Sequence, residues 1–253
     1  MSVLDSFRLD GKVVIVTGAS SGLGVSFAQG FAEAGADVVL GARRLEKMTA
    51  TAALVEQAGR RVHTHKTDVA DPEQCQQLVD AAMAEFGRVD VLINNAGVGT
   101  AVPATRETAE EFRSVIDVNL NGSYWVAQAC GRVMQPGSSI INIASILGLT
   151  TAGLPQAAYS ASKAGVIGLT RDLAQQWSGR KGIRVNALAP GFFVSEMTDE
   201  LKPGYLDSLM PRIVMGRLGD AAELAATAVW LASPAGGYVT GQTIVVDGGL
   251  TIA

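Results

Sequence analysis

The chain has 253 residues, of which 48% are hydrophobic and only 17% charged, and its formal net charge is −4. This apolar content excludes an intrinsically disordered chain, and no apolar run reaches the roughly 20 residues of a membrane-spanning helix. The acidic balance, without a basic cluster, argues against a nucleic-acid partner, because phosphates require grouped Lys and Arg. Glycine is abundant at 29 residues.

Two features bear on the cell compartment. The N-terminal stretch carries Asp5, Arg8 and Asp10 where a signal peptide needs an apolar core. The two cysteines, Cys75 and Cys130, lack metal-ligand spacing, so we expect buried free thiols, with one disulfide as the alternative. The sequence therefore predicts a cytoplasmic protein without a metal site.

Runs of apolar, mostly β-branched residues alternate along the sequence with segments of helical periodicity. Such continuous runs are typical of strands buried on both faces of a parallel sheet, and their alternation with helices predicts βαβ units with right-handed crossovers. We therefore predict a single doubly wound α/β (Rossmann) domain over residues 1–253, with helices on both faces of a seven-stranded parallel sheet. The expected strands are 13–17, 38–41, 62–66, 89–95, 139–145, 182–189 and 243–247, and the expected helices are 22–34, 44–58, 72–86, 108–133, 158–178 and 221–232.

The turn after the first strand, residues 17–24, reads TGASSGLG. Its glycines allow the backbone to approach a pyrophosphate closely, and the helix that follows offers free N–H groups and the positive end of its dipole. The spacing G-x-x-x-G-x-G differs from the dinucleotide fingerprint G-x-G-x-x-G, and an ordinary tight turn is the alternative. We interpret the segment as a nucleotide-binding turn.

The end of the second strand indicates which dinucleotide is bound. An acidic residue here suits the ribose 2′-hydroxyl of NAD, whereas an arginine suits the 2′-phosphate of NADP. Ala42 stands at the acidic position and Arg43 follows it. The sequence therefore favours NADP over NAD, although Arg43 and Arg44 also suit a solvated helix start.

Polar and small residues follow the third and fourth strands. Asp68 can accept a hydrogen bond from an adenine amino group, or it can begin the loop toward Pro72. The segment NNAG at 94–97 lets the backbone approach a cofactor ribose, and its composition suits a plain turn equally well.

Four polar residues form a candidate catalytic group. Tyr159 and Lys163 are four residues apart on an expected helix, so their side chains share one face. Ser145 ends the fifth strand, at the edge where ligands bind, and Asn119 lies inside an expected helix although an amide is a mediocre helix former.

A nearby ammonium lowers the pKa of a phenol from about 10, which makes Tyr159 a usable proton donor near neutral pH. With Ser145 donating to a carbonyl oxygen and Tyr159 protonating it, the group suits hydride transfer between C=O and CH–OH beside a nicotinamide. A purely local helix contact between Tyr159 and Lys163 is the alternative.

Seven motifs occur in a consistent order along nearly the whole sequence, and together they resemble the short-chain dehydrogenase/reductase family in its compact, single-domain branch. The C-terminal half is most similar to 3-oxoacyl-[acyl-carrier-protein] reductases. The motifs are TGASSGLG (17–24), NNAG (94–97), Asn119, Ser145, YSASK (159–163), PG (190–191) and TGQTIVVDGG (240–249).

The resemblance implies a role for each candidate residue. Tyr159 would be the general acid/base, Lys163 would lower its pKa and bind the nicotinamide ribose, Ser145 would orient the substrate carbonyl, and Asn119 would hold a relay water. It also implies cofactor contacts beyond Arg43, Tyr159 and Lys163. These would be Gly18, Ser20, Ser21, Gly22, Leu23 and Gly24 at the pyrophosphate, Asp68 and Val69 at the adenine, Asn95, Ala96 and Gly97 at the ribose, and Pro190, Gly191, Phe193 and Ser195 at the nicotinamide.

Members of this family are mostly tetramers, which implies a homotetramer. The link at 134–139 lacks the basic residues that help some relatives dock an acidic carrier protein, and Arg132 and Arg180 remain as candidates. We expect residues 149–155 at the substrate mouth and a helical lid at about 192–218, although core packing explains part of its apolar content. The expected apolar wall consists of Phe192, Phe193, Met197, Leu201, Tyr205, Leu209 and Met210.

The sequence leads to three hypotheses about function. The first is an NADP(H)-dependent carbonyl reductase or alcohol dehydrogenase acting on a small molecule, with 3-oxoacyl thioesters as the leading substrate. The second is an NAD-linked dehydrogenase of steroids, sugar alcohols or other secondary alcohols. The third is a nucleotide-binding scaffold or sensor without turnover, and the presence of all four catalytic candidates argues against it.

Overall fold

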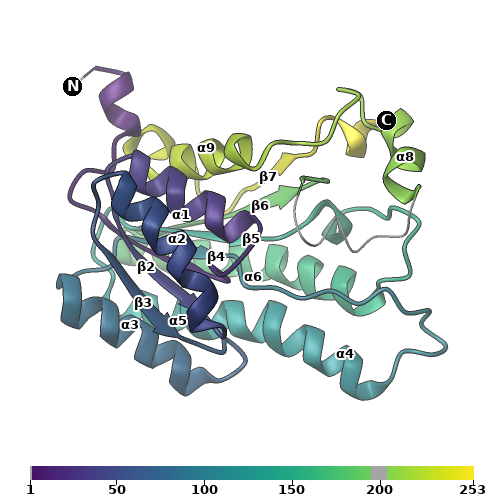
Figure 1. Cartoon of the computed structure of the whole chain (residues 1–253), viewed down its shortest axis with the longest axis horizontal. Coiled ribbons are helices and arrows are strands. Elements are labelled where there is room, and N and C mark those ends of the chain that lie inside the picture. The colour runs from purple at the N-terminus through teal and green to yellow at the C-terminus, as the bar shows by residue number, and fades with distance from the viewer. Residues whose placement is uncertain (1, 195–203) are drawn as a thin grey trace.

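The computed structural model of the protein describes residues 2–194 and 204–253. Within them, parallel strands form one seven-stranded sheet in the order β3-β2-β1-β4-β5-β6-β7, so the strand order reverses direction across the sheet between β1 and β4 (Figure 1). Ligands bind beyond the carboxyl ends of the strands at such a reversal. The strands are β1 Val13–Thr17, β2 Asp37–Ala42, β3 Val62–Lys66, β4 Val91–Asn94, β5 Ser139–Ile143, β6 Arg184–Pro190 and β7 Thr243–Val246.

Helices cover both faces of the sheet (Figure 1). One apolar cluster joins α1, α2 and α9 to one face, and a second joins α3, α5 and α6 to the other. The helices are α1 Leu23–Glu33, α2 Leu45–Gln57, α3 Pro72–Phe86, α4 Ala109–Ile116, α5 Gly122–Val133, α6 Ala157–Lys181, α8 Tyr205–Leu209 and α9 Ala221–Ala232. The predicted doubly wound α/β fold is therefore confirmed.

Burial explains why the strand runs are continuous rather than alternating. Every residue of β1, β2, β4 and β5 is buried, because layers of helix cover both sides of the sheet. The two edge strands are more open: β7 has one exposed residue, and β3 is buried at none of its positions.

The largest departure from the predicted elements lies in helix 108–133. The predicted helix is present over 109–133, but a π-helical turn, Asp117–Asn121, interrupts its α-helical hydrogen bonding and divides it into α4 and α5. Asn119 sits in this turn and is fully buried. Single π-helical turns inside α-helices occur frequently at functional sites.

Two boundary differences also affect the candidate site. β5 ends at Ile143, so Ser145 lies beyond the strand and begins a short 3₁₀ turn, Ile146–Gly148. In the predicted lid, the described part contains the short helix α8 and a 3₁₀ turn, Met210–Arg212. The lid positions Ser195, Met197 and Leu201 lie outside the described residues.

A series of buried polar side chains crosses the middle of the sheet. Asn142 on β5 donates from Nδ2 to Thr170 Oγ1 on α6 at 2.9 Å, and its Oδ1 accepts from Asn94 Nδ2 on β4 at 3.0 Å. Asn94 also donates to the C=O of Ser123 on α5 at 2.8 Å. Four elements are therefore joined by hydrogen bonds within an otherwise apolar interior.

Both cysteines are buried free thiols, as expected. Burial raises the pKa of Cys75 to about 12, so this thiol stays protonated and unreactive. No described helix is long and apolar enough to span a bilayer. Residues 2–194 and 204–253 bring together no set of His, Cys, Asp and Glu that could hold a metal ion.

Candidate active site

The glycine turn at the start of α1 has the shape and free N–H groups that a pyrophosphate needs. Gly22 is the N-cap of α1 with a φ of 56°, and neither a capping side chain nor an acidic residue occupies the first turn. Gly18 has a φ of 67°, and a Cβ there would lie 2.8 Å from Ala96 Cα, while a Cβ at Gly24 would collide with the C=O of Gly18. The turn therefore fits a dinucleotide pyrophosphate.

Thr17 and Asn95 fasten this turn to the neighbouring strand. Thr17 Oγ1 accepts from the N–H groups of Asn95 and Ala96, each at 3.0 Å. Asn95 Nδ2 donates to the C=O of Thr17 at 3.0 Å and to the C=O of Gly18 at 3.3 Å. The side chain of Asn95, expected at the ribose, is thus engaged in holding the turn, and the part played by Thr17 was not predicted.

The two arginines after β2 are both exposed, and one of them contacts the glycine turn. Arg43 is exposed at the strand end, whereas Nη2 of Arg44 donates to Ser20 Oγ and Ser21 Oγ, both at 3.4 Å. Arg44 therefore carries positive charge to the glycine turn. The sequence indicates Arg43 alone, because the order of two adjacent arginines does not show which side chain turns back toward the glycine turn.

The loop after β3 is held by its own polar groups. The N–H of Asp68 donates to Gln74 Oε1 at 2.9 Å, and Asp68 Oδ1 accepts from the N–H of Ala70 at 3.1 Å. Val69 is buried against Gly122 of α5, where a Cβ would lie only 2.8 Å from Val69 Cγ2. Both residues shape this loop, which leads into α3.

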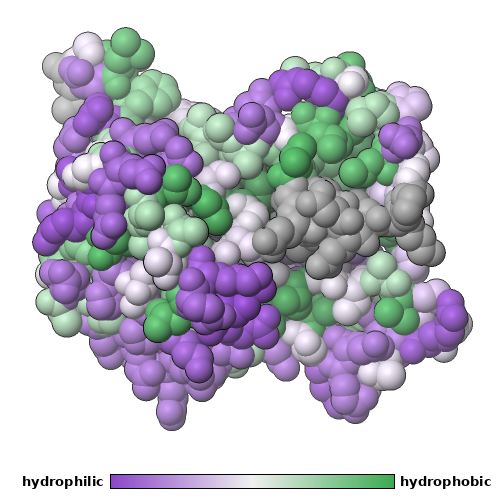
Figure 2. Space-filling view, viewed as in Figure 1, coloured by the Kyte–Doolittle hydropathy of each residue, from purple (hydrophilic) through white to green (hydrophobic). Residues whose placement is uncertain are grey.

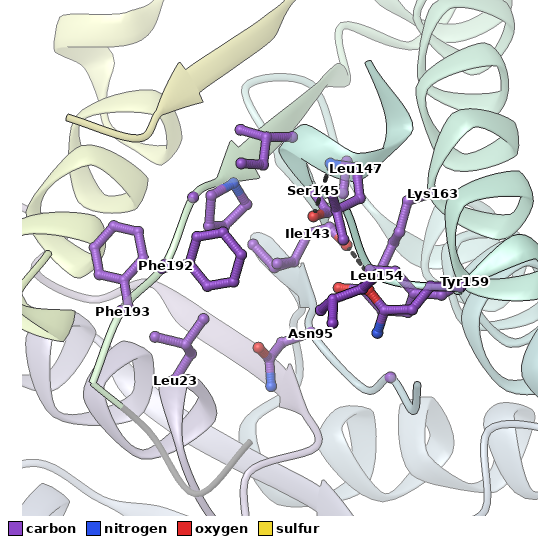
Figure 3. Close-up of a pocket in the computed structure, with 16 residues that line it drawn as sticks. Leu23, Asn95, Ile143, Ser145, Leu147, Leu154, Tyr159, Lys163, Phe192 and Phe193 are labelled. Carbon is purple, nitrogen blue, oxygen red and sulfur yellow. Dashed lines mark hydrogen bonds between the residues drawn. The ribbon is translucent and has the colours of Figure 1, made fainter. Parts of the chain in front are cut away.

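A cavity of about 880 Å³, including its open mouth, lies at the carboxyl ends of β4, β5 and β6. Figure 3 shows Ser145, Lys163 and Tyr159 on one side and Leu23, Phe192 and Phe193 on the other. The cavity brings together many of the predicted site residues: Leu23, Asn95, Gly97, Ser145, Tyr159, Lys163, Pro190, Gly191 and Phe193.

Ser145, Tyr159 and Lys163 meet where water is largely excluded. Lys163 Nζ donates to the C=O of Ile143 at 2.7 Å and lies 5.6 Å from the ring centre of Tyr159. Burial lowers the pKa of Lys163 to about 8. Burial also raises the pKa of Tyr159, and the nearby Ser145 hydroxyl opposes that rise. The arrangement can orient a carbonyl oxygen and exchange a proton with it.

Asn119 supports this group without lining the cavity. Its Oδ1 accepts from the N–H of Val98 at 2.8 Å, and its Nδ2 donates to the C=O of Val98 at 2.9 Å and to Ser162 Oγ at 3.0 Å. Ser162 in turn donates to the C=O of Tyr159 at 2.7 Å. The Asn119 carboxamide therefore connects the loop after β4 to the turn of α6 that carries Tyr159, through Ser162, which the sequence alone did not indicate.

Apolar residues and one hydrogen bond form the substrate mouth. Tyr205 Oη donates to the C=O of Ala152 at 2.7 Å, and the Tyr205 ring meets Phe192 edge-on with centres 6.0 Å apart. Leu154 lines the cavity, so residues from the expected 149–155 segment do border it. In the space-filling view, hydrophobic side chains gather at the upper right, over α8 and the C-terminal turn (Figure 2).

Comparisons with known proteins agree with this geometry. A family model described as enoyl-(acyl carrier protein) reductase matches residues 18–251. The protein is 40% identical to the 3-oxoacyl-[acyl-carrier-protein] reductase FabG of Thermotoga maritima over 97% of its own length and 100% of that protein. It is 38% identical to gluconate 5-dehydrogenase of Gluconobacter oxydans over the full length of both.

A crystal structure of a short-chain type dehydrogenase/reductase from Mycobacterium marinum superposes with a TM-score of 0.95 at 34% identity, over 100% of both proteins. The shared fold, the glycine turn and the full-length identities lead to one conclusion. The protein belongs to the short-chain dehydrogenase/reductase family of oxidoreductases, which use a nicotinamide dinucleotide to interconvert ketones and secondary alcohols.

Proposed function

We propose that the protein is an NADP(H)-dependent reductase of 3-oxoacyl thioesters. The observation that carries the proposal is the single cavity wall formed by Ser145, Tyr159 and Lys163, beside a turn that fits a dinucleotide pyrophosphate. The similarity to a 3-oxoacyl reductase over nearly the whole sequence supports the thioester. The apolar mouth, with Leu147, Leu154 and Phe192, suits an acyl group.

In the proposed reaction, Ser145 donates a hydrogen bond to the substrate carbonyl and Tyr159 protonates the oxygen. A bound nicotinamide supplies the hydride. The ammonium of Lys163 favours the phenolate form of Tyr159, which counters the effect of burial on that phenol. Asn119 acts as a positioning residue through Val98 and Ser162, and it remains the residue proposed to hold a relay water.

The cofactor contacts follow the glycine turn and the strand ends. The free N–H groups at the start of α1 would bind the pyrophosphate, and Arg43, assisted by Arg44, would bind a 2′-phosphate. Asp68 and Val69 remain the proposed adenine contacts, and Gly97 the proposed ribose contact. Pro190, Gly191 and Phe193 would border the nicotinamide.

The assembly and location are proposals of the same kind. We propose a homotetramer, because family members are mostly tetramers, and a cytoplasmic location, because both cysteines are buried free thiols. Docking of a carrier protein has weaker support, since Arg132 already donates to Gln76 and Gln128 at 3.0 Å each.

A second candidate is an NAD-linked dehydrogenase of sugar acids or sugar alcohols. The full-length identity to gluconate 5-dehydrogenase favours it. Its cofactor preference would conflict with the positive charge that Arg43 and Arg44 place after β2.

The deciding experiment follows the near-ultraviolet absorbance of the reduced nicotinamide with NADPH and with NADH. The substrates are 3-oxobutanoyl thioesters, cyclic ketones, steroids and keto-sugars. We expect the highest kcat/KM for the thioester with NADPH. Fastest turnover of a keto-sugar with NADH would replace the proposed function by the second candidate.

A further inference from the structure

The side chain of Gln156 lies at the catalytic cavity, and its amide has no hydrogen-bonding partner among the described residues. The residue lines the cavity three positions before Tyr159. Its Oε1 is buried without a hydrogen-bonding partner, and within residues 2–194 and 204–253 its Nε2 donates no hydrogen bond. Unpaired polar groups are rare where protein excludes water, so an amide with no partner at either end in a ligand-sized cavity points to a role toward the ligand.

Helix capping does not provide that explanation. Gln156 is the N-cap residue of α6, yet its side chain makes no capping hydrogen bond. Its backbone carbonyl alone serves the helix, accepting from the N–H of Ser160 at 2.9 Å. The amide is therefore free to serve the cavity.

Most of the other polar side-chain groups of the cavity lining already have a partner or an assigned role. Asn95 Nδ2 holds the glycine turn, and Lys163 Nζ donates to the C=O of Ile143. Ser145 and Tyr159 are assigned to the reacting oxygen under the proposed function. Within the described lining, the Gln156 amide and Asn95 Oδ1 are the remaining polar side-chain groups, and the lining also includes the apolar Leu147 and Leu154.

Gly99 shows that the amide and the catalytic phenol border the same small volume. A Cβ placed on Gly99 would lie 3.3 Å from Tyr159 Cδ2 and 3.8 Å from Gln156 Nε2. Because both side chains also line the catalytic cavity, the amide nitrogen borders the same space as the ring of Tyr159. Since Oε1 is the buried end, the end that faces this space is a donor.

We propose that Gln156 is a specificity-determining residue whose Nε2 donates a hydrogen bond to a second carbonyl oxygen of the substrate, two carbons from the reacting ketone. A 3-oxo ester or 3-oxo thioester carries such an oxygen, and a simple ketone does not. The proposal rests on the proposed function for the placement of the reacting ketone, and it names the feature that distinguishes substrate classes at that site.

The test compares three ketones that differ in the group near Gln156. Ethyl 3-oxobutanoate carries the second carbonyl, 2-heptanone is of similar length without it, and 4-hydroxy-2-butanone replaces it by a hydroxyl. The variant Gln156→Met keeps the side-chain length and removes both polar atoms. Gln176→Met, on an exposed position of the same helix, is the matched control.

We expect Gln156→Met to lower kcat/KM for ethyl 3-oxobutanoate about tenfold, the value of one neutral hydrogen bond in a dry site. The value for 2-heptanone should change less than about twofold, and Gln176→Met should change neither. Gln156→Glu presents an acceptor instead of a donor. It should lower kcat/KM for ethyl 3-oxobutanoate further than Gln156→Met does.

Equal losses for all three ketones, or no loss for any, would overturn the proposal, because a structural role affects substrates alike. A loss confined to 4-hydroxy-2-butanone would also overturn it, since the amide would then be accepting from a hydroxyl. The proposed function is tested separately, on the wild-type enzyme. It fails if the wild-type enzyme does not turn over 3-oxobutanoyl thioesters with either NADPH or NADH.

Discussion

Asn119 and Val98 exchange two hydrogen bonds: the Val98 N–H donates to Oδ1 at 2.8 Å, and Nδ2 donates to the Val98 C=O at 2.9 Å. The Asn119 carboxamide therefore bonds to both the N–H and the C=O of Val98, as the backbone of a neighbouring β-strand does. This pairing fixes the loop between Gly97 and Gly99, which borders both Lys163 and Tyr159.

Removing that pairing should affect activity and stability together. Asn119→Ala leaves the partly buried N–H and C=O of Val98 without these partners, at a cost of up to about 1–3 kcal/mol for each group. We expect kcat/KM to fall at least about 100-fold and the melting temperature to drop. Asn121→Ala, two residues along the same π-helical turn, removes only an exposed bond to Asp117 and serves as the control.

The phenol of Tyr159 should be indispensable for turnover and dispensable for cofactor binding. General acid–base groups contribute about 10²–10⁴-fold, so Tyr159→Phe should lower kcat by about that factor while the Kd for NADPH changes little. Tyr205→Phe breaks the bond to Ala152 at the mouth and should alter KM more than kcat. Turnover of Tyr159→Phe within tenfold of wild type would contradict the proposed mechanism.

Lys163 should destabilise the fold in a way that depends on pH. Burial lowers its pKa from 10.5 to about 8, so the unfolded protein binds the proton more tightly than the folded protein. The penalty, about 3 kcal/mol, is complete below about pH 8 and shrinks as the pH rises toward 10.5.

Lys163→Met should therefore be more stable than wild type at pH 7, although the unpaired C=O of Ile143 offsets about 1 kcal/mol of the gain. The advantage over wild type should decrease between about pH 8 and pH 10, as urea unfolding at several pH values would measure. An advantage that is constant with pH would show that Lys163 is not desolvated in the folded state.

The arginines after β2 should affect the two dinucleotides differently. Arg43→Ala removes a charge proposed to meet the 2′-phosphate, and the Kd for NADPH should rise about 10- to 100-fold while that for NADH hardly changes. Arg44→Ala loosens the serines of the glycine turn and should weaken both dinucleotides. Lys47→Ala, exposed on α2, is the control. Equal effects of Arg43→Ala on both would remove the NADP assignment.

Arg184 should stabilise the protein far from the active site. Its guanidinium donates to the C=O groups of Leu231, Ala232 and Ser233, where α9 ends and its dipole is negative. Arg184→Met should lower the free energy of unfolding by about 2–4 kcal/mol in urea titrations. Arg180→Met, exposed at the end of α6, should lower it little, and both variants should keep their activity per folded molecule.

The sequence predicted what depends on local pattern. Continuous runs such as VVIVT at β1 indicated strands buried on both faces, and the sheet confirms them. The π-helical turn escaped prediction because its partners are distant: Val98 lies 21 residues before Asn119, and Ser162 lies 43 residues after it. Two further features depend on the directions of side chains, which residue spacing does not show. They are the contact of Arg44 with Ser20 and the lack of a hydrogen-bonding partner for Gln156.

The polar series through Asn94, Asn142 and Thr170 restricts how the central strands can align. A shift of β5 by one residue would turn Asn142 to the opposite face and leave the amides of β4 and β5 unpaired in an apolar layer. Parallel strands made of interchangeable Val and Ile distinguish neighbouring alignments poorly. These amides stabilise one alignment of β4 and β5 relative to the others. The ends of the two strands, which Asn95 and Ser145 follow, therefore keep a fixed position relative to each other.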